Sequence, residues 1–357
     1  MKLKLIKLNF TSPLHLGSGK PDFYGKSETR LHSDTIKSAI FSTALLFDNS
    51  LGLEFFNSFK VSSAFPYSGD SLFFPVPDMP INELIEKFEI NFDCEGSKKS
   101  DYDKGKIVKK IKYLDKTQYQ KFINGEKINV EIREKNDEYQ QLISGYLLSV
   151  FVKAKDFKIS RNEVNQRVYV SRMAEILASE ENNPKFSDPY YIDKIYFHKN
   201  AGLFFLINID DNKYFEVIKK AIELLEDMGL GTDRNVGNGQ FKASNEELDL
   251  EVPSEAQLQT NLSLFVPEED ELEGIMQIED IEDKMYYTLI ERGGYISNFM
   301  DSHSGTLLKN PVMMFSEASV FPNLKLNGKT VDVTPEAMKS KHNVWRDGSS
   351  IFIPVKR

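Results

Sequence analysis

The chain has 357 residues, 40% of them hydrophobic and 28% charged, with a net charge of −9 at pH 7. This length allows about two domains. No run of eighteen apolar residues suggests a membrane span, and the single cysteine, Cys94, excludes an internal disulfide and a cysteine-built metal site. These features together predict a cytoplasmic protein without membrane contact.

The amino-terminal segment predicts a strand, a loop and a helix. Residues 2–10 alternate lysine and leucine, which indicates a strand rather than a secretion signal. A loop rich in Gly, Pro and Ser follows. Residues 33–47 have apolar side chains at helical spacing, and Ser33 or Asp34 is suited to cap that helix. Residues 71–77 then indicate a strand that ends at prolines.

Two basic segments occupy the middle of the chain. Residues 97–121 contain nine Lys against three Asp, and residues 153–172 contain six basic side chains against two acidic ones. We interpret residues 93–140 as an insertion that is part helical and part mobile, solvated loop. A basic face of this kind can meet a polyanion, although solvated surface is the simpler interpretation of either segment.

The next segment completes an alternating pattern. Residues 192–209 hold two strand-like runs joined at "KNAG", which predicts a hairpin. Residues 211–229 predict an amphipathic helix that Gly229 ends, and residues 240–244 resume extended structure. The order strand, helix, strand, strand, helix, strand predicts a ferredoxin-like α+β domain over residues 1–247.

The carboxy-terminal part is expected to form a smaller, strand-rich domain over residues 248–357. It begins within an acidic stretch, residues 246–283, which contains 14 acidic residues and no Lys or Arg and is interpreted as a linker. "LSLFVP" at 262–267 predicts a strand, and three further apolar segments supply more.

The stretch "DMGLGTDRNVGNGQF", residues 227–241, contains four glycines and an arginine. Nucleotide-binding phosphate loops lie between a strand and the start of a helix, whereas this loop follows a helix, whose carbonyl end repels phosphate. The Walker and Rossmann spacings are also absent. Two interpretations remain: a long turn, or a loop whose amides and Arg234 grip a sugar-phosphate backbone. The number of glycines favours the second.

A glycine-rich loop between the second helix and last strand of a ferredoxin-like domain resembles the signature of the RAMP superfamily of CRISPR proteins. "FTSPLHLGSG" followed by "LHSDTIKSAIF" resembles the amino-terminal pattern of the family of fourth subunits of the type III-A (Csm) effector complex, in the Cas-five-like group. "ISRNEVNQRVYVSR" lies where RAMP proteins carry an RNA-contacting segment. "LSLFVP", "YYTLIERGGYI", "PVMMFSEASVF" and "VDVTP" resemble that family's carboxy-terminal region. The resemblance spans nearly the whole chain apart from the insertion.

The resemblance implies a fold of RAMP-type ferredoxin-like (RRM-like) domains, with a thumb-like segment at about 153–185 and a ferredoxin-like-derived carboxy-terminal domain. It also implies a non-catalytic subunit, without cofactor or metal, that caps the 5′ handle of the CRISPR RNA. Its protein partners would be the large polymerase-like Csm subunit and a backbone RAMP Csm subunit. The RNA-binding residues implied are His15, Gly17, Ser18, Lys37, Lys158, Arg161, Asn162, Arg167, Gly229, Gly231, Arg234, Gly237 and Gly239.

Two alternatives stay open at this point. The first is a standalone RAMP endoribonuclease that processes CRISPR repeats with His15 as general acid or base, because a histidine pKa suits proton transfer. His15 lacks a nearby lysine or tyrosine that would complete such a site. The second is a nucleotide-binding enzyme that uses the glycine loop, which the reversed order of helix and strand disfavours.

Overall fold

The computed structural model describes residues 1–17, 27–28, 30–92, 101–132, 141–142, 145–148, 160–168, 189–281, 284–296 and 307–357. The helices are α1 (Ser33–Ala44), α2 (Leu53–Asn57), α3 (Ile81–Lys87), α4 (Asp101–Lys110), α5 (Lys116–Ile123), α7 (Asn212–Met228) and α8 (Glu269–Met276). None of these described helices combines the length and apolarity that a bilayer crossing requires.

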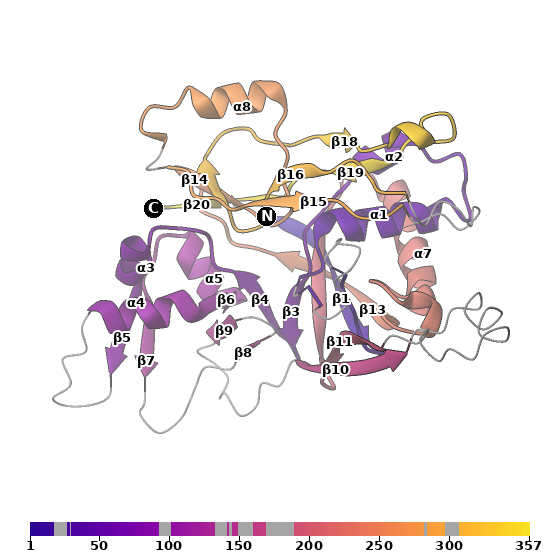
Figure 1. The fold of residues 1–357 in the computed structure, drawn as a ribbon. Coiled ribbons are helices and arrows are strands. Elements are labelled where there is room, and N and C mark those ends of the chain that lie inside the picture. The colour runs from indigo at the N-terminus through magenta and orange to yellow at the C-terminus, as the bar shows by residue number, and fades with distance from the viewer. Residues whose placement is uncertain are drawn as a thin grey trace.

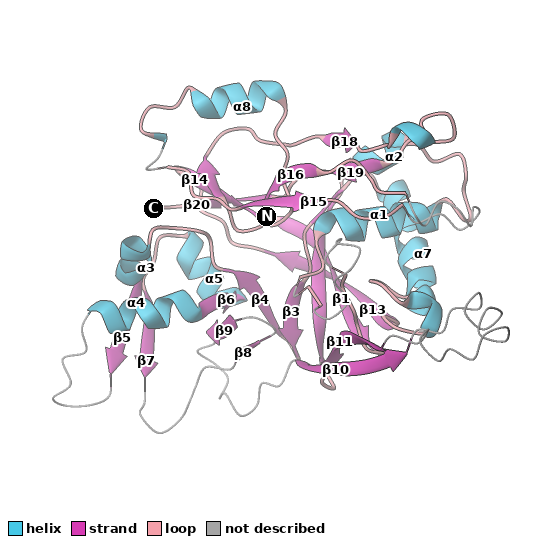
Figure 2. Ribbon diagram, viewed as in Figure 1, coloured by secondary structure: helices cyan, strands magenta, loops and turns pink. Residues whose placement is uncertain are grey.

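The strands of the first two thirds of the chain are β1 (Lys2–Phe10), β2 (Lys60–Val61), β3 (Phe65–Ser68), β4 (Ser71–Pro75), β5 (Phe88–Phe92), β6 (Ile111–Asp115), β7 (Ile128–Ile132), β8 (Gln141–Leu142), β9 (Gly145–Leu148), β10 (Ser160–Val168), β11 (Pro189–Phe197), β12 (Ala201–Asn208) and β13 (Phe241–Asp249). Those of the last third are β14 (Leu258–Asn261), β15 (Leu289–Arg292), β16 (Val312–Phe315), β17 (Val320–Pro322), β18 (Thr330–Asp332), β19 (Trp345–Asp347) and β20 (Phe352–Val355). Figures 1 and 2 show their arrangement.

The central sheet has the ferredoxin-like order predicted from the sequence. Its strands run β13-β1-β12-β3, and each neighbouring pair is antiparallel. Helices α1 and α7 pack side by side on one face of this sheet (Figure 1). Ile6 and Phe205 on that face share a core with the two helices, whereas Leu5 and Phe204 on the opposite face belong to a second core. The fold is therefore α+β, with a sheet buried on both faces.

Local sequence accounts for the helix α7 but only partly for α1. The Asp211 side chain accepts a hydrogen bond from Lys213 N at 2.7 Å and caps α7, and Gly229 with φ of 79° ends it. Helix α1 has no side-chain cap, so the prediction of capping by Ser33 or Asp34 is wrong. Both residues lie in its first turn, and their side chains bind groups elsewhere in the fold: Ser33 Oγ accepts from Leu264 N at 2.9 Å, and Asp34 pairs with distant arginines.

The described part of the lysine-rich insertion is packed rather than mobile. Strand β6 pairs with β4 and so extends the central sheet, and Asp115 caps α5 by accepting from Gln118 N at 2.9 Å. Leu114, Tyr119 and Phe122 are completely buried in the core beneath. The expectation of a solvated loop is thus wrong for residues 101–132, because apolar residues between the lysines face inward. Residues 93–100 and 133–140 lie outside the described residues.

The prediction that the two strands flanking "KNAG" pair with each other as a hairpin is wrong. Strand β11 pairs with β10 over nine residues, whereas β12 lies in the central sheet between β1 and β3. The turn itself exists, since Asn200 has φ of 63° and Ala201 N donates to His198 O at 3.0 Å. The turn therefore leads the chain from the β10-β11 ribbon into the central sheet, and β11 pairs with β10 rather than with β12.

The carboxy-terminal strands lie against the second core. They form the sheet β17-β14-β20 and two ribbons, β15-β16 and β18-β19. The strand predicted at 262–267 is displaced to β14, and residues 246–249 of the predicted linker belong to β13 instead. There Glu246 and Glu247 pair with Lys7 and Lys4 of β1 at 3.0 and 2.7 Å. The second core contains residues from both predicted domains, so it does not separate them. The domain boundary at 247/248 therefore stays a prediction.

Candidate nucleic-acid interface

The glycine-rich loop after α7 packs against the loop that joins β1 to α1. Gly239 N donates to Pro13 O at 2.8 Å, and Thr232 N donates to His15 O at 2.9 Å. Within the loop, Leu230 N donates to Gly239 O at 2.9 Å. Two loops that are more than 200 residues apart thus form one surface, held by backbone hydrogen bonds.

The four loop glycines serve two different purposes. All have φ between 77° and 88°, a region that favours glycine. A Cβ on Gly229 would lie 2.6 Å from Asn238 O, and Cβ atoms on Gly231 and Gly239 would collide with His15 O and Leu230 O. A Cβ on Gly237 would meet nothing within 4 Å. Three glycines therefore allow close packing within the protein, whereas Gly237 is exposed and has open space where a side chain would be.

Arg234 lies at the outer turn of this loop, in a short 3-10 helix spanning Arg234–Val236. Its side chain is half-buried, and burial lowers its pKa from the ordinary value. Among the described residues no carboxylate or carbonyl pairs with the guanidinium. An unpaired, partly desolvated cation beside exposed backbone is suited to bind an anionic group.

The side chain of His15 is buried beneath the β1–α1 loop. Its side chain is 1% exposed, and Nδ1 lies 2.6 Å from Asp193 O, while Nε2 has no hydrogen-bond partner among the described atoms. Nearby, Ser27 N donates to Asp193 Oδ2 at 3.1 Å and Ser27 Oγ accepts from Leu16 N at 3.0 Å. The prediction that the His15 side chain contacts RNA is therefore wrong for this conformation, because the imidazole orders the loop from inside.

Gly17 lies at the outer edge of the same surface. It is exposed, and a Cβ there would lie 3.1 Å from Thr232 Cγ2 of the glycine loop. Gly17 thus lets the two loops approach closely. Ser18 lies outside the described residues.

The β10-β11 ribbon adjoins these loops. An isolated bridge joins Leu14 to Ile195 of β11, with Leu14 N donating to Ile195 O at 2.9 Å. In the ribbon, Arg161 is opposite Tyr196, Asn162 is opposite Ile195 and Arg167 is opposite Tyr190. Three predicted RNA-binding positions thus lie on β10, the strand paired with β11, whereas β11 itself contacts the loop. Lys158 lies outside the described residues.

Lys37 is the clearest correction among the predicted RNA-binding residues. It is completely buried, and its Nζ lies 2.9 Å from Asp347 Oδ1 and near the rings of Phe56 and Phe59. An ammonium held in this interior pair is not available to RNA. The helical pattern placed Lys37 beside the apolar face of α1, but its partner lies 310 residues away.

Sequence reasoning also missed an interior contact that supports the loop. Lys194 Nζ donates to Asn238 Oδ1 at 3.1 Å, and both side chains are buried. This contact ties the glycine loop to β11. Neither residue lies in a recognisable motif, so no local signal could have identified it. The described residues contain no group of three or more His, Cys, Asp and Glu side chains arranged to hold a metal ion.

The family model and the related proteins that match this chain all carry the name Csm4. Residues 254–355 match the family model described as the CRISPR Csm4 C-terminal domain. The chain is 25% identical over 397 residues to the CRISPR system Cms protein Csm4 of Methanocaldococcus jannaschii, covering 99% of this chain and 97% of the relative. It is 23% identical over 194 residues to Csm4 of Thermococcus onnurineus, covering 54% of each chain.

Solved structures support the fold. A chain in the crystal structure of a Csm3-Csm4 subcomplex of the type III-A CRISPR-Cas interference complex matches with a TM-score of 0.59 and 19% identity, covering 100% of both chains. A chain in the Csm1-Csm4 cassette in complex with cA4 matches with a TM-score of 0.59 and 17% identity, covering 100% of this chain and 98% of the other. Both likenesses concern the fold.

Proposed function

We propose that this chain, whose residues 254–355 match the Csm4 C-terminal domain and whose whole length is similar to a Csm4 protein, is a non-catalytic RNA-binding subunit of a type III-A Csm complex. It holds the 5′ handle of the CRISPR RNA on the surface formed by the β1–α1 loop, the glycine-rich loop and the β10-β11 ribbon. Its protein partners are the large polymerase-like subunit and a backbone RAMP subunit, as the structures of Csm1-Csm4 and Csm3-Csm4 assemblies suggest.

One observation carries the RNA-binding proposal: an unpaired, half-buried Arg234 lies beside the open backbone of Gly237. The loop is fixed from beneath by hydrogen bonds to Pro13 and His15, so RNA binding would not have to order it. Phosphate groups are commonly bound by guanidinium groups, and the absence of a side chain at Gly237 lets a sugar-phosphate backbone approach closely.

The β10-β11 ribbon extends this surface. Arg161 and Arg167 lie on β10, opposite Tyr196 and Tyr190 of β11, and so add two cations to a ribbon whose other strand contacts the β1–α1 loop. Tyr191 of β11 is 53% exposed and offers an aromatic ring. Single-stranded RNA is commonly held by such a combination of cations and stacking rings.

The proposal of a non-catalytic role rests on His15. A general acid or base must come within hydrogen-bond reach of the group it protonates. The buried imidazole, engaged at Nδ1, does not reach a ligand on the surface. We therefore do not propose the alternative of a repeat-processing ribonuclease.

We place the contact with the large subunit on one face of the β15-β16 ribbon. Leu289 and Met313 are 45% and 54% exposed, and Tyr287 packs edge-on against Phe315 at 5.1 Å between ring centroids. The register places Leu289 opposite Phe315 and Met313 opposite Glu291, so the apolar side chains share a face. Exposed patches rich in aromatic residues and Met are typical of protein interfaces.

Arg234→Ala should weaken binding of the host's repeat-derived handle RNA by about tenfold to a hundredfold, because one charge-assisted contact is worth about 1.5–3 kcal/mol. The slope of log K against log salt should also fall by about one, since one fewer counterion is released. Fluorescence anisotropy over a salt series measures both quantities. Lys339→Ala, which removes an exposed lysine paired with Glu336, is the control. An unchanged affinity and slope for Arg234→Ala would contradict the proposed RNA site.

Met313→Glu should abolish co-purification with the large subunit while handle binding is retained, because a carboxylate would be desolvated in an apolar contact. Leu224→Glu changes an exposed leucine of α7, away from the ribbon, and should leave the assembly intact. Quantitative co-purification of tagged subunits measures the effect. Full retention of the large subunit by Met313→Glu would place the contact on another surface.

A further inference from the structure

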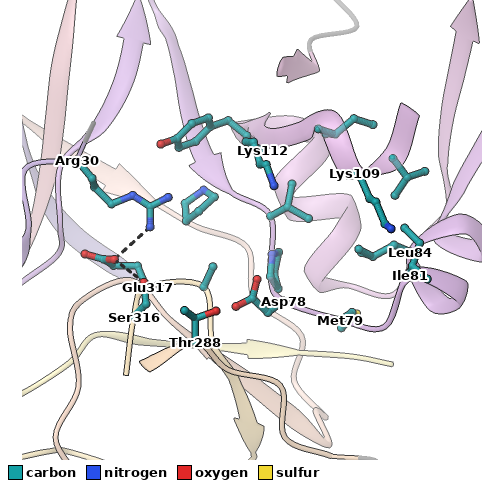
Figure 3. Close-up of a pocket in the computed structure, with 17 residues that line it drawn as sticks. Arg30, Asp78, Met79, Ile81, Leu84, Lys109, Lys112, Thr288, Ser316 and Glu317 are labelled. Carbon is teal, nitrogen blue, oxygen red and sulfur yellow. Dashed lines mark hydrogen bonds and ion pairs between the residues drawn. The ribbon is translucent and has the colours of Figure 1, made fainter. Parts of the chain in front are cut away.

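A cavity of about 560 Å³ separates the lysine-rich insertion from the carboxy-terminal strands (Figure 3). One wall comes from α3, α4 and β6, and the other comes from Thr288 and the turn 316–318. The walls are joined at the base, since Val76 N donates to Lys112 O at 3.1 Å and Asp78 N donates to Ala318 O at 2.7 Å. The cavity is therefore a fixed feature of the fold, and it lies outside the RNA surface described above.

The charges in this cavity are partly uncompensated. Lys109 and Lys112 extend from the insertion wall toward Asp78 and Met79 (Figure 3), and no described residue forms an ion pair with either lysine. Glu317, by contrast, is already neutralised, because its Oε2 lies 3.1 Å from Arg30 Nη1 and its Oε1 lies 2.6 Å from His32 Nδ1. The cavity thus offers an anionic ligand two ammonium groups that have no ion-pair partner among the described residues.

Beside the two lysines, the cavity is lined by apolar side chains and by one hydrogen-bond acceptor, the carboxylate of Asp78. Met79, Ile81, Leu84 and Val108 form a continuous apolar side next to the lysines. Asp78 is half-buried, and its carboxylate accepts no hydrogen bond from a described residue. A ligand that fits has a flat or apolar part, a hydrogen-bond donor and a negative charge.

We infer that this cavity binds a nucleoside phosphate, with the phosphate on Lys109 and Lys112, the base against the apolar wall, and a ribose hydroxyl or base amino group donating to Asp78. The volume is in the range that small-ligand sites usually have, about 300–1,000 Å³. A fatty acid would satisfy the lysines and the apolar wall but would leave Asp78 without a donor. Inorganic phosphate would leave the apolar wall unused.

Asp78 gives this site a distinctive pH dependence. Burial raises the pKa of Asp78 to about 6, against the opposing effect of Arg30 and Lys112. Glu317 does not titrate in this range, because although burial raises its pKa, His32 and Arg30 hold it well below the ordinary value. An anionic ligand should therefore bind more tightly as the pH falls through 6, because protonation of Asp78 removes a repelling charge while its carbonyl oxygen still accepts a hydrogen bond from the ligand.

The test uses the full chain and the dinucleoside monophosphate UpU, whose phosphodiester charge is constant between pH 5 and 8. Isothermal titration should detect binding that tightens on acidification in the wild type and is insensitive to pH in Asp78→Asn. Lys109→Ala with Lys112→Ala should weaken binding by about tenfold or more, as expected for loss of charge-assisted contacts. Lys127→Ala, an exposed lysine paired with Glu89, should have no effect.

Two comparisons identify the source of the ligand. If UMP binds as tightly as UpU and a short single-stranded oligouridylate does not compete, the site takes a free nucleotide. If the oligomer competes and binds more tightly, the site takes a nucleotide of a strand. Arg234→Ala should leave both results unchanged, which separates this site from the proposed handle site. Equal binding of inorganic phosphate and UMP, or binding that the double lysine variant leaves unchanged, would overturn the inference.

Discussion

Asp34→Asn should lower the free energy of unfolding by about 3–5 kcal/mol, the usual cost of removing one partner from a buried ion pair. Asp34 lies in the first turn of α1 and is 3% exposed. Its Oδ1 lies 3.1 Å from Arg292 Nη2 and its Oδ2 lies 3.2 Å from Arg292 Nε, while Arg346 Nη1 also contacts Oδ2. An asparagine would leave two arginines from the carboxy-terminal part against a neutral side chain.

The pH dependence of this loss has a definite sign. Burial alone would raise the pKa of Asp34, but Arg292 and Arg346 outweigh it and hold that pKa below its ordinary value. A depressed pKa in the folded state stabilises the protein above the unfolded-state pKa, about 4. The difference between wild type and Asp34→Asn should thus be constant from pH 5 to 8 and should shrink as the pH falls through the folded-state pKa.

Urea denaturation at several pH values measures this difference. Glu247→Gln removes the exposed partner of Lys4 and should leave the midpoint essentially unchanged, because exposed pairs contribute little. Equal stability of Asp34→Asn and wild type at pH 7 would show that the two arginines do not depend on this carboxylate.

Lys37→Met should also cost about 3–5 kcal/mol, although methionine preserves the volume and the contact with Phe56 and Phe59. The loss would come from Asp347, which is completely buried and, among the described residues, would retain only Ser349 as a hydrogen-bond donor. Adding Asp347→Asn should restore much of the stability, because the amide oxygen still accepts from Ser349 and no unpaired charge remains.

A double-mutant cycle by urea denaturation should give a coupling of about 2 kcal/mol or more, within the range for residues in direct contact. The single variant Asp347→Asn offers a second check. Burial lowers the pKa of Lys37, and Asp347 partly opposes that shift. Without Asp347 the folded state would bind fewer protons than the unfolded state, so stability should rise with pH between 7 and 10. Additive losses in the cycle would mean that the two charges act independently.

Both pairs join α1 to β19 through consecutive residues of that strand, Arg346 and Asp347. Their partners on α1, Asp34 and Lys37, lie one turn apart and carry the opposite order of charges. A register slip of one residue in β19 would bring like charges together. We therefore expect these pairs to fix the position of β19 on the helix as well as to stabilise it.

The candidate RNA site was predictable in outline and not in detail. The glycine loop was identified because helix, glycines and strand are adjacent in the sequence. The individual roles of Gly231 and Gly239 were not predictable. A Cβ on Gly231, for example, would collide with the carbonyl oxygen of His15, which is distant in the sequence. The leucines on either side of His15 indicated a semi-buried histidine, but they could not identify its partner, because Asp193, whose carbonyl oxygen lies 2.6 Å from Nδ1, is 178 residues away.

The sequence by itself determined the order of the ferredoxin-like strands and helices, the buried face of α7 and the existence of the glycine loop. These features depend on periodicity and on glycine, which act over a few neighbouring residues. Only the tertiary structure decided which charged side chains face solvent. Lys37 and Arg234 are both basic side chains that the sequence alone does not distinguish. Lys37 pairs with a buried carboxylate 310 residues away, whereas Arg234 has no carboxylate partner among the described residues. Such pairings depend on contacts between distant segments, and local patterns carry no record of them.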